Sequence, residues 1–108
     1  MKIWQKGMEI AEETYKVTRQ LPRAELYALA SQMNRCSVSI PSNIAEGASR
    51  RSEKDQARFI HFSMGSSFEL ETQLILSSRL YPEISVEGLL ALLEEEQKML
   101  AGYYSKLG

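Results

Sequence analysis

The sequence has few of the residues on which disulfide-bonded, metal-binding and catalytic proteins depend. It contains one cysteine, Cys36, and one histidine, His61, among 108 residues. A lone cysteine cannot form a disulfide within the chain and suits a reducing compartment, so we expect a cytoplasmic protein. Cys36 and His61 cannot by themselves make a thiolate-rich zinc site. A di-iron bundle needs Glu-x-x-His motifs, and the residue three positions before His61 is Arg58. We therefore expect neither a metal nor a cofactor.

Long apolar runs are also missing. No segment approaches the roughly 20 apolar residues of a membrane-spanning helix, and the first residues form no continuous apolar segment of signal-peptide length. We therefore expect no contact with a membrane. The chain has only 3 prolines and 6 glycines, too few for a loop-rich β protein. A nucleophile elbow and a glycine-rich phosphate loop are absent too, so we expect no enzyme.

The chain has no large excess of charge of either sign. Its 13 Lys and Arg against 14 Asp and Glu give a net charge of −1, which excludes a uniformly basic nucleic-acid-binding protein. The charges are unevenly placed, however. Residues 1–58 hold 10 basic and 7 acidic residues, a net of +3, and residues 59–108 hold 3 and 7, a net of −4. Such asymmetry is typical either of a basic face or of helices that complement one another.

What the sequence does contain is apolar residues at helical spacing along nearly its whole length. Helices are predicted over approximately residues 3–20, 22–46, 53–80 and 86–106. Pro22 ends the first helix and suits the first position of the second. Gly47 is expected to stop the second helix, and Ser52 to cap the third. Because the connections are short, we predict an all-α, antiparallel up-down four-helix bundle in one domain, residues 1–108.

The apolar stripes are wider than one bundle core needs. The first helix carries two of them, Trp4, Met8, Ala11 and Tyr15 beside Ile3, Ile10 and Val17. The predicted inner faces of the third and fourth helices include Phe59, Phe62, Ser66, Leu70 and Gln73, and Val86, Leu89, Leu93, Leu100, Tyr104 and Leu107. More apolar residues are present than a narrow bundle seam needs, namely Ile3, Ile10 and Val17 on the first helix and Leu92 and Met99 on the fourth. A monomer would leave some of them in water, which favours self-association. The alternative is that a wide stripe faces an irregular core.

Pro41 lies inside the predicted second helix, where a proline removes one backbone hydrogen bond and costs roughly 3 kcal/mol. Short polar side chains surround it, including Ser39 and Asn43, and these can bond to the freed backbone groups. We predict a kink at Pro41, or two collinear pieces with a new start near Ser39. The alternative is that the proline is merely tolerated.

Several polar residues stand at positions that favour structural or interface roles. Glu46 lies at the negative end of the second helix, where Arg50 would offset the unfavourable dipole interaction. In the third helix Gly65 interrupts large residues beside Ser66, and a glycine there allows another backbone to come close. Glu69 borders the predicted inner face, and a buried carboxylate needs a positive partner, for which Arg35 and Arg58 are the candidates.

The basic residues concentrate in one place, at Arg50, Arg51, Lys54 and Arg58. Arg51, Lys54 and Arg58 are three and four residues apart, so they would share one side of a helix that begins early enough. Such a cluster can bind phosphate groups. The alternative is a solvated helix start with Glu53 and Asp55 as local partners.

These segments resemble the 23S rRNA intervening-sequence protein family, whose members are also called four helix bundle proteins. The likeness lies in residues 21–74, above all in SIPSNIAEG at 39–47, in Arg50-Arg51 and in GSSFELE at 65–71. The resemblance implies a four-helix bundle that assembles into a homopentamer. The family's polar motif positions are matched here by Asn43, Glu46, Arg50, Ser66 and Glu69, and the resemblance supplies no catalytic residues. Relatives include accessory proteins of diversity-generating retroelements, which bind nucleic acid but are strongly basic, unlike this chain.

Two functions remain open at this point. The first is a non-enzymatic homo-oligomer that acts as a scaffold or adaptor for RNA or a ribonucleoprotein, with the basic cluster contacting phosphate. The second is a scaffold that binds only proteins, which the low net charge favours.

Overall fold

A computed structural model describes residues 1–107, and in that range the fold is all-α, as predicted. It contains four long helices, α1 (Lys2–Thr18), α2 (Leu29–Ala48), α3 (Glu53–Leu80) and α4 (Glu87–Ser105), and one short 3₁₀ helix, η1 (Arg23–Glu25). The structure agrees with the sequence prediction for α3 and lies within two residues of it for α1 and α4. The prediction that a second long helix begins at Pro22 is wrong.

The segment between α1 and α2 is extended and turned rather than helical. Pro22 opens only the single turn of η1, and Ala28 has φ −121° and ψ −105°, which are not helical angles. Leu26 and Tyr27 are exposed, Tyr27 to 92%. A longer helix here would gain no buried apolar face, and helices draw most of their stability from such faces. The Tyr81 hydroxyl instead donates a 2.6 Å hydrogen bond to the Glu25 carboxylate and ties the segment to the α3–α4 connection.

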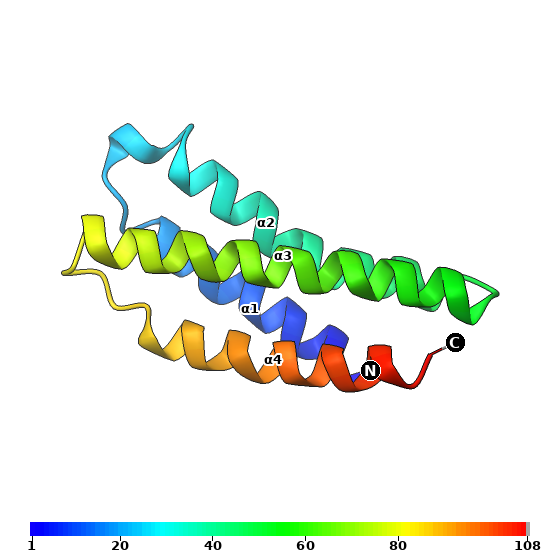
Figure 1. Cartoon of the computed structure of the whole chain (residues 1–108). Coiled ribbons are helices and arrows are strands. Elements are labelled where there is room, and N and C mark those ends of the chain that lie inside the picture. Colours follow the sequence, from blue (N-terminus) through cyan, green and yellow to red (C-terminus); the bar gives the residue numbers. More distant parts are fainter. Residues whose placement is uncertain (108) are drawn as a thin grey trace.

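The four helices pack around one core, in an elongated molecule of 44 × 23 × 18 Å. Each long helix packs against two others: α2 contacts α1 and α3, and α4 contacts α3 and α1. Figure 1 shows the helices lying alongside one another, with both chain termini at the same end. The core side chains without exposed surface are Ile10, Met33, Ile40, Ile44, Ile60, Leu70, Leu74, Leu93 and Leu100.

The two stripes of α1 take opposite positions from those expected. Ile3, Ile10 and Val17 are buried in the core, whereas Trp4, Met8 and Tyr15 remain about 40% exposed. The β-branched stripe thus packs inside, and the larger, amphipathic side chains face outward. The width of the apolar pattern indicates that one stripe of α1 is exposed to water. That stripe is the one with Trp4, Met8 and Tyr15.

The inner face of α3 combines the large side chains Ile60, Leu70 and Leu74 with three small ones. Ser63, Ser67 and Ser77 are fully buried, whereas Phe62, expected inside, is 46% exposed. A buried serine can bond to a helix carbonyl and leaves room for a neighbouring helix to come close. Ser63 Oγ does this across the interface, donating a 2.9 Å hydrogen bond to the backbone oxygen of Ile40 in α2. Close approach of α2 and α3 therefore leaves the large rings of α3 outside.

The helix α2 continues without a break through Pro41, so the expectation of two separate pieces is wrong, and a bend at Pro41 stays a prediction. Polar side chains bond to backbone carbonyls on both sides of the proline. Asn43 Nδ2 donates to the oxygen of Ser39 at 2.8 Å. Gly47 lies within α2 rather than after it. Its lack of a side chain matters for packing, because a Cβ atom there would lie 3.1 Å from Cβ of Phe59.

Candidate functional site

The turn between α2 and α3 holds the basic cluster, and its ion pairs divide the four basic residues into two groups. Arg50 pairs with Glu46 at 2.9 Å and lies 3.8 Å from Asp55, and Arg58 pairs with Asp55 at 3.3 Å. The pair between Arg50 and Glu46 joins positions four apart at the end of α2, where a positive charge also meets the negative end of the helix. Arg50 and Arg58 are therefore partly neutralised inside the turn.

Arg51 and Lys54 make up the second group. Both are exposed, and within residues 1–107 neither takes part in an ion pair. The local backbone explains their position. The Asp55 N–H donates to Ser52 Oγ at 3.1 Å, so Ser52 caps α3 as the sequence predicts and begins the helix at Glu53. Lys54 thus projects from the first turn of α3, and Arg51 from the residue before the cap.

Aromatic rings lie against the arginines of this turn. The Arg50 guanidinium lies 4.7 Å from the ring centroid of Phe59, and that of Arg58 lies 5.1 Å from Phe59 and 5.8 Å from Phe62. The two rings meet edge to face at 5.6 Å. Such cation–π contacts hold a guanidinium in place while its edge stays accessible. The turn therefore combines positive charge with exposed aromatic surface.

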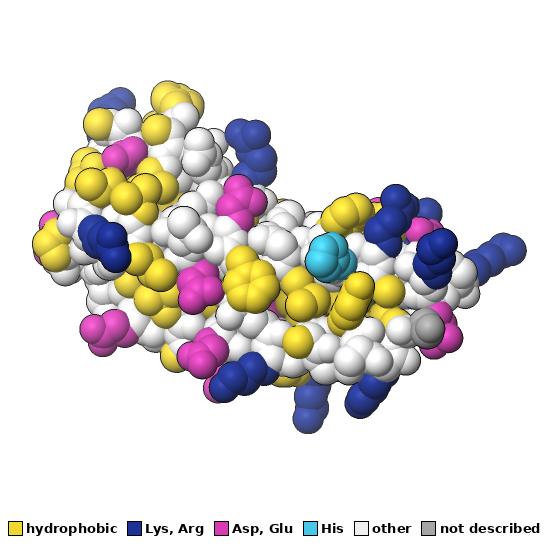
Figure 2. Space-filling model, viewed as in Figure 1, with side chains coloured by type: hydrophobic (Ala, Val, Ile, Leu, Met, Phe, Trp, Pro, Cys, Tyr) yellow, Lys and Arg dark blue, Asp and Glu magenta, His cyan; other side chains and the backbone are white. Residues whose placement is uncertain are grey.

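His61 extends this surface toward α4. Its ring centroid lies 5.8 Å from that of Tyr104, and both side chains are exposed. Arg58, His61 and Phe62 are three and four residues apart, so they share one face of α3. Figure 2 shows the histidine among hydrophobic side chains, with Lys and Arg side chains gathered toward the same end of the molecule. We call Arg58, His61, Phe62 and Tyr104 the basic–aromatic surface.

The polar residues predicted on α2 and α3 form a second, smaller group. Ser39 Oγ donates a 2.5 Å hydrogen bond to Ser66 Oγ, and Cys36 Sγ donates to the Ser66 backbone oxygen at 3.0 Å. Burial, together with the nearby Glu69 carboxylate, raises the pKa of the Cys36 thiol to about 12. This group is a link between α2 and α3 that leaves the thiol protonated and unreactive.

Glu69 and Arg35 differ from their expected arrangement. Both are exposed, and no ion pair joins Glu69 to Arg35 or Arg58 in the described part of the chain. The two side chains instead border a shallow groove beside Cys36 and Ser39. Glu69 needs no buried partner because water solvates it.

Gly65 is exposed in the middle of α3, and a Cβ atom built on it would meet nothing within 4 Å. The expected close approach of another backbone is therefore absent within the chain. Glycine inside a helix costs about 1 kcal/mol relative to alanine. Exposed apolar side chains follow Gly65 along α3: Phe68 is 52% exposed, and Ile75 and Leu76 are exposed further along.

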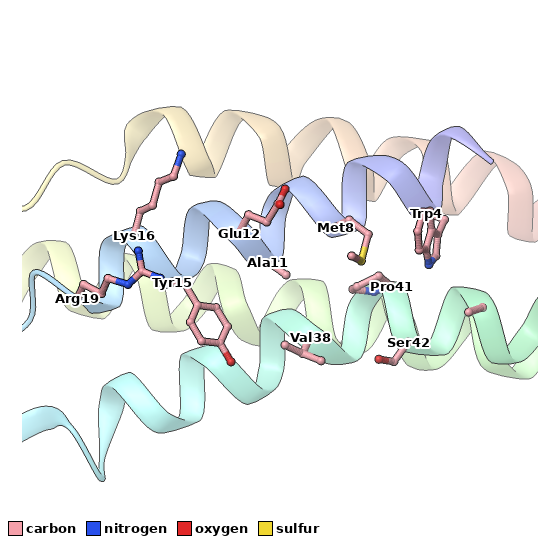
Figure 3. Close-up of a pocket in the computed structure, with 11 residues that line it drawn as sticks. Trp4, Met8, Ala11, Glu12, Tyr15, Lys16, Arg19, Val38, Pro41 and Ser42 are labelled. Atoms are coloured by element: carbon pink, nitrogen blue, oxygen red, sulfur yellow. The ribbon is translucent and has the colours of Figure 1, made fainter.

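A groove of about 590 Å³ separates the outer sides of α1 and α2. Figure 3 shows Trp4, Met8 and Tyr15 projecting from α1 toward α2, opposite Val38 and Pro41. Glu12, Lys16 and Arg19 border it on α1. The groove is therefore apolar along its length and charged along one side.

Glu96 is a residue that sequence reasoning missed. It is 0% exposed, and neither carboxylate oxygen has a hydrogen-bond partner. Burial raises its pKa to about 8, although the charge of Lys6 opposes the shift. The signal was present in the sequence, because Glu96 stands between Leu93 and Leu100 at the spacing of the inner stripe of α4.

Within residues 1–107 no three His, Cys, Asp or Glu side chains gather closely enough to hold a metal ion. None of the described helices is long and apolar enough to cross a membrane.

A comparison with protein families gives one match. The family model described as 23S rRNA-intervening sequence protein matches residues 1–102, which span α1, α2, α3 and most of α4. A comparison with curated proteins found no match. The resemblance carried by SIPSNIAEG and its neighbouring motifs is thus confirmed over nearly the whole chain.

Proposed function

The chain belongs to the 23S rRNA-intervening sequence protein family, and we propose that it is a non-enzymatic, homo-oligomeric scaffold or adaptor for RNA or a ribonucleoprotein. The α2–α3 turn is the part that contacts phosphate. The observation that carries the proposal is the pair of exposed cations, Arg51 and Lys54, which no acidic side chain neutralises in residues 1–107. Unpaired arginine and lysine side chains are the usual phosphate ligands in RNA complexes.

Oligomerisation would reconcile this site with a net charge of −1. The α2–α3 turn of one copy offers two unpaired cations, Arg51 and Lys54, which neutralise too few phosphates for strong binding at physiological salt. A ring would place one α2–α3 turn per subunit on a common surface. We propose a homopentamer, in keeping with the family resemblance, and place it in the cytoplasm, which suits the free thiol of Cys36.

Each subunit would be an antiparallel up-down bundle. Contacts between α1 and α2 and between α2 and α3 support the antiparallel arrangement of these neighbouring helices. Near its end α1 meets the start of α2, where Thr18 Oγ1 donates to Asn34 Oδ1 at 2.8 Å, and near its start it meets Pro41, far along α2. For α2 and α3, Met33 Sδ lies near Ser77, whereas Gly47 lies near Phe59.

Two separate apolar surfaces support self-association. One is the groove between α1 and α2, and the other is the exposed row on α3 around Gly65 and Phe68. Because the two surfaces lie on different helices, a contact between them joins unlike faces of two copies. Contacts of that kind close into rings when the rotation permits. A bend at Pro41, which lines the groove, would set its shape.

The test is binding of a structured RNA at two salt concentrations by protein whose oligomer mass is known. Each phosphate contact adds about −0.9 to the log–log salt slope for duplex sites and about −0.7 for single strands. Arg51→Ala/Lys54→Ala should weaken binding and flatten the slope. A matched control is Arg23→Ala/Arg79→Ala, which removes two exposed arginines from η1 and from the last turn of α3. Equal losses in both variants would contradict a site at the turn.

The second candidate is a scaffold that binds proteins only. The net charge of −1 and the two apolar surfaces favour it. The same experiment separates the two functions, because absence of RNA binding at low salt would leave the protein-binding function. The proposal assigns no catalytic residue, and intact RNA after incubation with Mg²⁺ is the expected result. If the purified Arg51→Ala/Lys54→Ala variant still cleaves RNA, the protein is an enzyme and the proposal is wrong.

A further inference from the structure

We propose that the basic–aromatic surface is a stacking platform for unpaired bases, so that the RNA bound by this protein is single-stranded where it crosses α3 and α4. The inference rests on the proposed function and adds the class of nucleic acid and the side chains that recognise it. Phe62 and Tyr104 are the rings that bases would stack on, with Arg58 beside Phe62 and His61 beside Tyr104.

The geometry leaves the two rings accessible. Phe62 is 46% exposed and Tyr104 is 40% exposed, so both rings present apolar surface to water. Phe62 is supported by Phe59 and Arg58, and Tyr104 is supported by His61. The guanidinium of Arg58 lies 5.8 Å from the Phe62 centroid, and the His61 ring lies 5.8 Å from that of Tyr104. The supports hold the rings in place, which lowers the entropy that binding would otherwise cost.

Charge beside the rings favours nucleic acid over an apolar partner. The unpaired cations Arg51 and Lys54 precede Arg58 along the same end of α3, and Lys106 is exposed at the end of α4. Phosphates can therefore lie along the cations while bases reach the rings. Proteins that bind single strands combine these two features, a positive track and aromatic side chains. The apolar row further along α3, around Phe68 and Ile75, has no such cluster of unpaired cations and is assigned to subunit contacts instead.

The same geometry disfavours a duplex. Bases in a double helix are stacked on each other and paired, so their faces cannot reach a protein ring. Phosphates of either form can reach Arg51 and Lys54. A preference for single strands should therefore come from Phe62 and Tyr104, and the dependence on salt from the cations.

The experiment measures binding of three labelled probes of equal length by fluorescence anisotropy at two salt concentrations: a single-stranded RNA without secondary structure, the same strand in a duplex, and an abasic strand. Phe62→Leu/Tyr104→Leu removes both rings and keeps apolar bulk. The control is Tyr27→Leu, which removes an exposed ring from the connection between α1 and α2, outside both the basic–aromatic surface and the apolar row. Stacking typically accounts for about 5- to 150-fold in affinity per base.

The proposal expects the single strand to bind at least about tenfold more tightly than the abasic strand. It expects the double variant to lose that preference with an unchanged salt slope, and Tyr27→Leu to keep it. Equal binding of all three probes by the wild type, with no effect of the double variant, would overturn the stacking platform and leave the proposed function standing. No binding of any probe would overturn both. A changed oligomer mass for the double variant, with wild-type affinity per subunit, would assign these rings to a protein contact and overturn the inference.

Discussion

Gly7 of α1 lies directly against Pro41 of α2. A Cβ atom built on Gly7 would be 3.3 Å from Cβ of Pro41 and 3.1 Å from Oε2 of Glu96 in α4. Three helices therefore meet at a residue without a side chain, next to a proline ring and a buried carboxyl group. Pro41, which reduces the intrinsic stability of α2 as a helix, forms part of this contact. The same residue lines the groove between α1 and α2, so the contact connects the interior to that groove.

Gly7→Ala should lower stability, although alanine favours a helix. The gain in helix propensity is about 1 kcal/mol. Overpacking a tight site costs typically about 1–3 kcal/mol, and the rigid ring of Pro41 gives way less easily than a flexible chain would. We expect a net loss of about 1 kcal/mol in the free energy of urea unfolding. Gly102→Ala is the control, because an added Cβ there meets nothing within 4 Å. Gly102→Ala should stabilise the protein. A similar gain in stability for Gly7→Ala would show that Gly7 is not tightly packed against Pro41 and Glu96.

Glu96→Gln should change how stability depends on pH. The pKa of Glu96 rises from its ordinary 4.5 to about 8 on folding, because the carboxyl group is buried without hydrogen bonds. The folded protein therefore holds a proton that the unfolded chain has released, and stability falls as pH rises from 4.5 to about 8. At 1.36 kcal/mol per pH unit the loss reaches about 3 kcal/mol at neutral pH. Lys6 on α1, itself paired with Glu95 at 2.9 Å, is the charge that opposes this loss.

The measurement is urea unfolding at pH 5, 6, 7 and 8. Wild type should lose stability across this range, and Glu96→Gln should hold a flatter profile and exceed the wild type at pH 7. Glu94→Gln, an exposed position on the same helix, is the control and should run parallel to the wild type. Parallel profiles for all three proteins would mean that Glu96 is ionised in the fold with a normal pKa.

Gly65→Ala should separate the stability of the subunit from its assembly. Nothing in the chain lies within 4 Å of an added Cβ, so the substitution should raise the stability of the single bundle by about 0.5–1 kcal/mol. If the surface around Gly65 meets a second copy, the same methyl group should weaken the oligomer. Mass by light scattering over a dilution series tests this, with Gly102→Ala as the control. An unchanged dissociation profile would remove Gly65 from the interface.

Glu46→Gln should have only a small effect. The pair between Glu46 and Arg50 is close, at 2.9 Å, but both side chains are substantially exposed. Exposed ion pairs are worth about 0.2–1 kcal/mol and weaken with salt. We expect a loss below about 1 kcal/mol in low salt that shrinks further in 0.5–1 M salt. A loss of several kcal/mol would mean that Glu46 is buried in the assembled protein.

Much of the fold followed from local pattern. The sequence predicts that α3 begins after the capping residue Ser52 and ends before Tyr81-Pro82, and the structure has the same two ends. The start of α2 did not follow, because Pro22 suits a helix start locally, while only tertiary packing shows that residues 23–28 have nothing to bury. The basic cluster was also visible, but its division into paired and unpaired cations depends on where Asp55 and Glu46 fall in space.

By itself the sequence determined the all-α class, the family and the place of the basic turn, since these depend on residue spacing and short motifs that act within one or two helical turns. Tertiary structure alone decided which apolar stripe of α1 faces the core, because Ile3-Ile10-Val17 and Trp4-Met8-Tyr15 have the same helical period. It also decided that Glu96 is buried beside Gly7 and that Tyr104 meets His61. Those contacts join residues far apart in the chain, and only the packing of α4 on its neighbours brings them together.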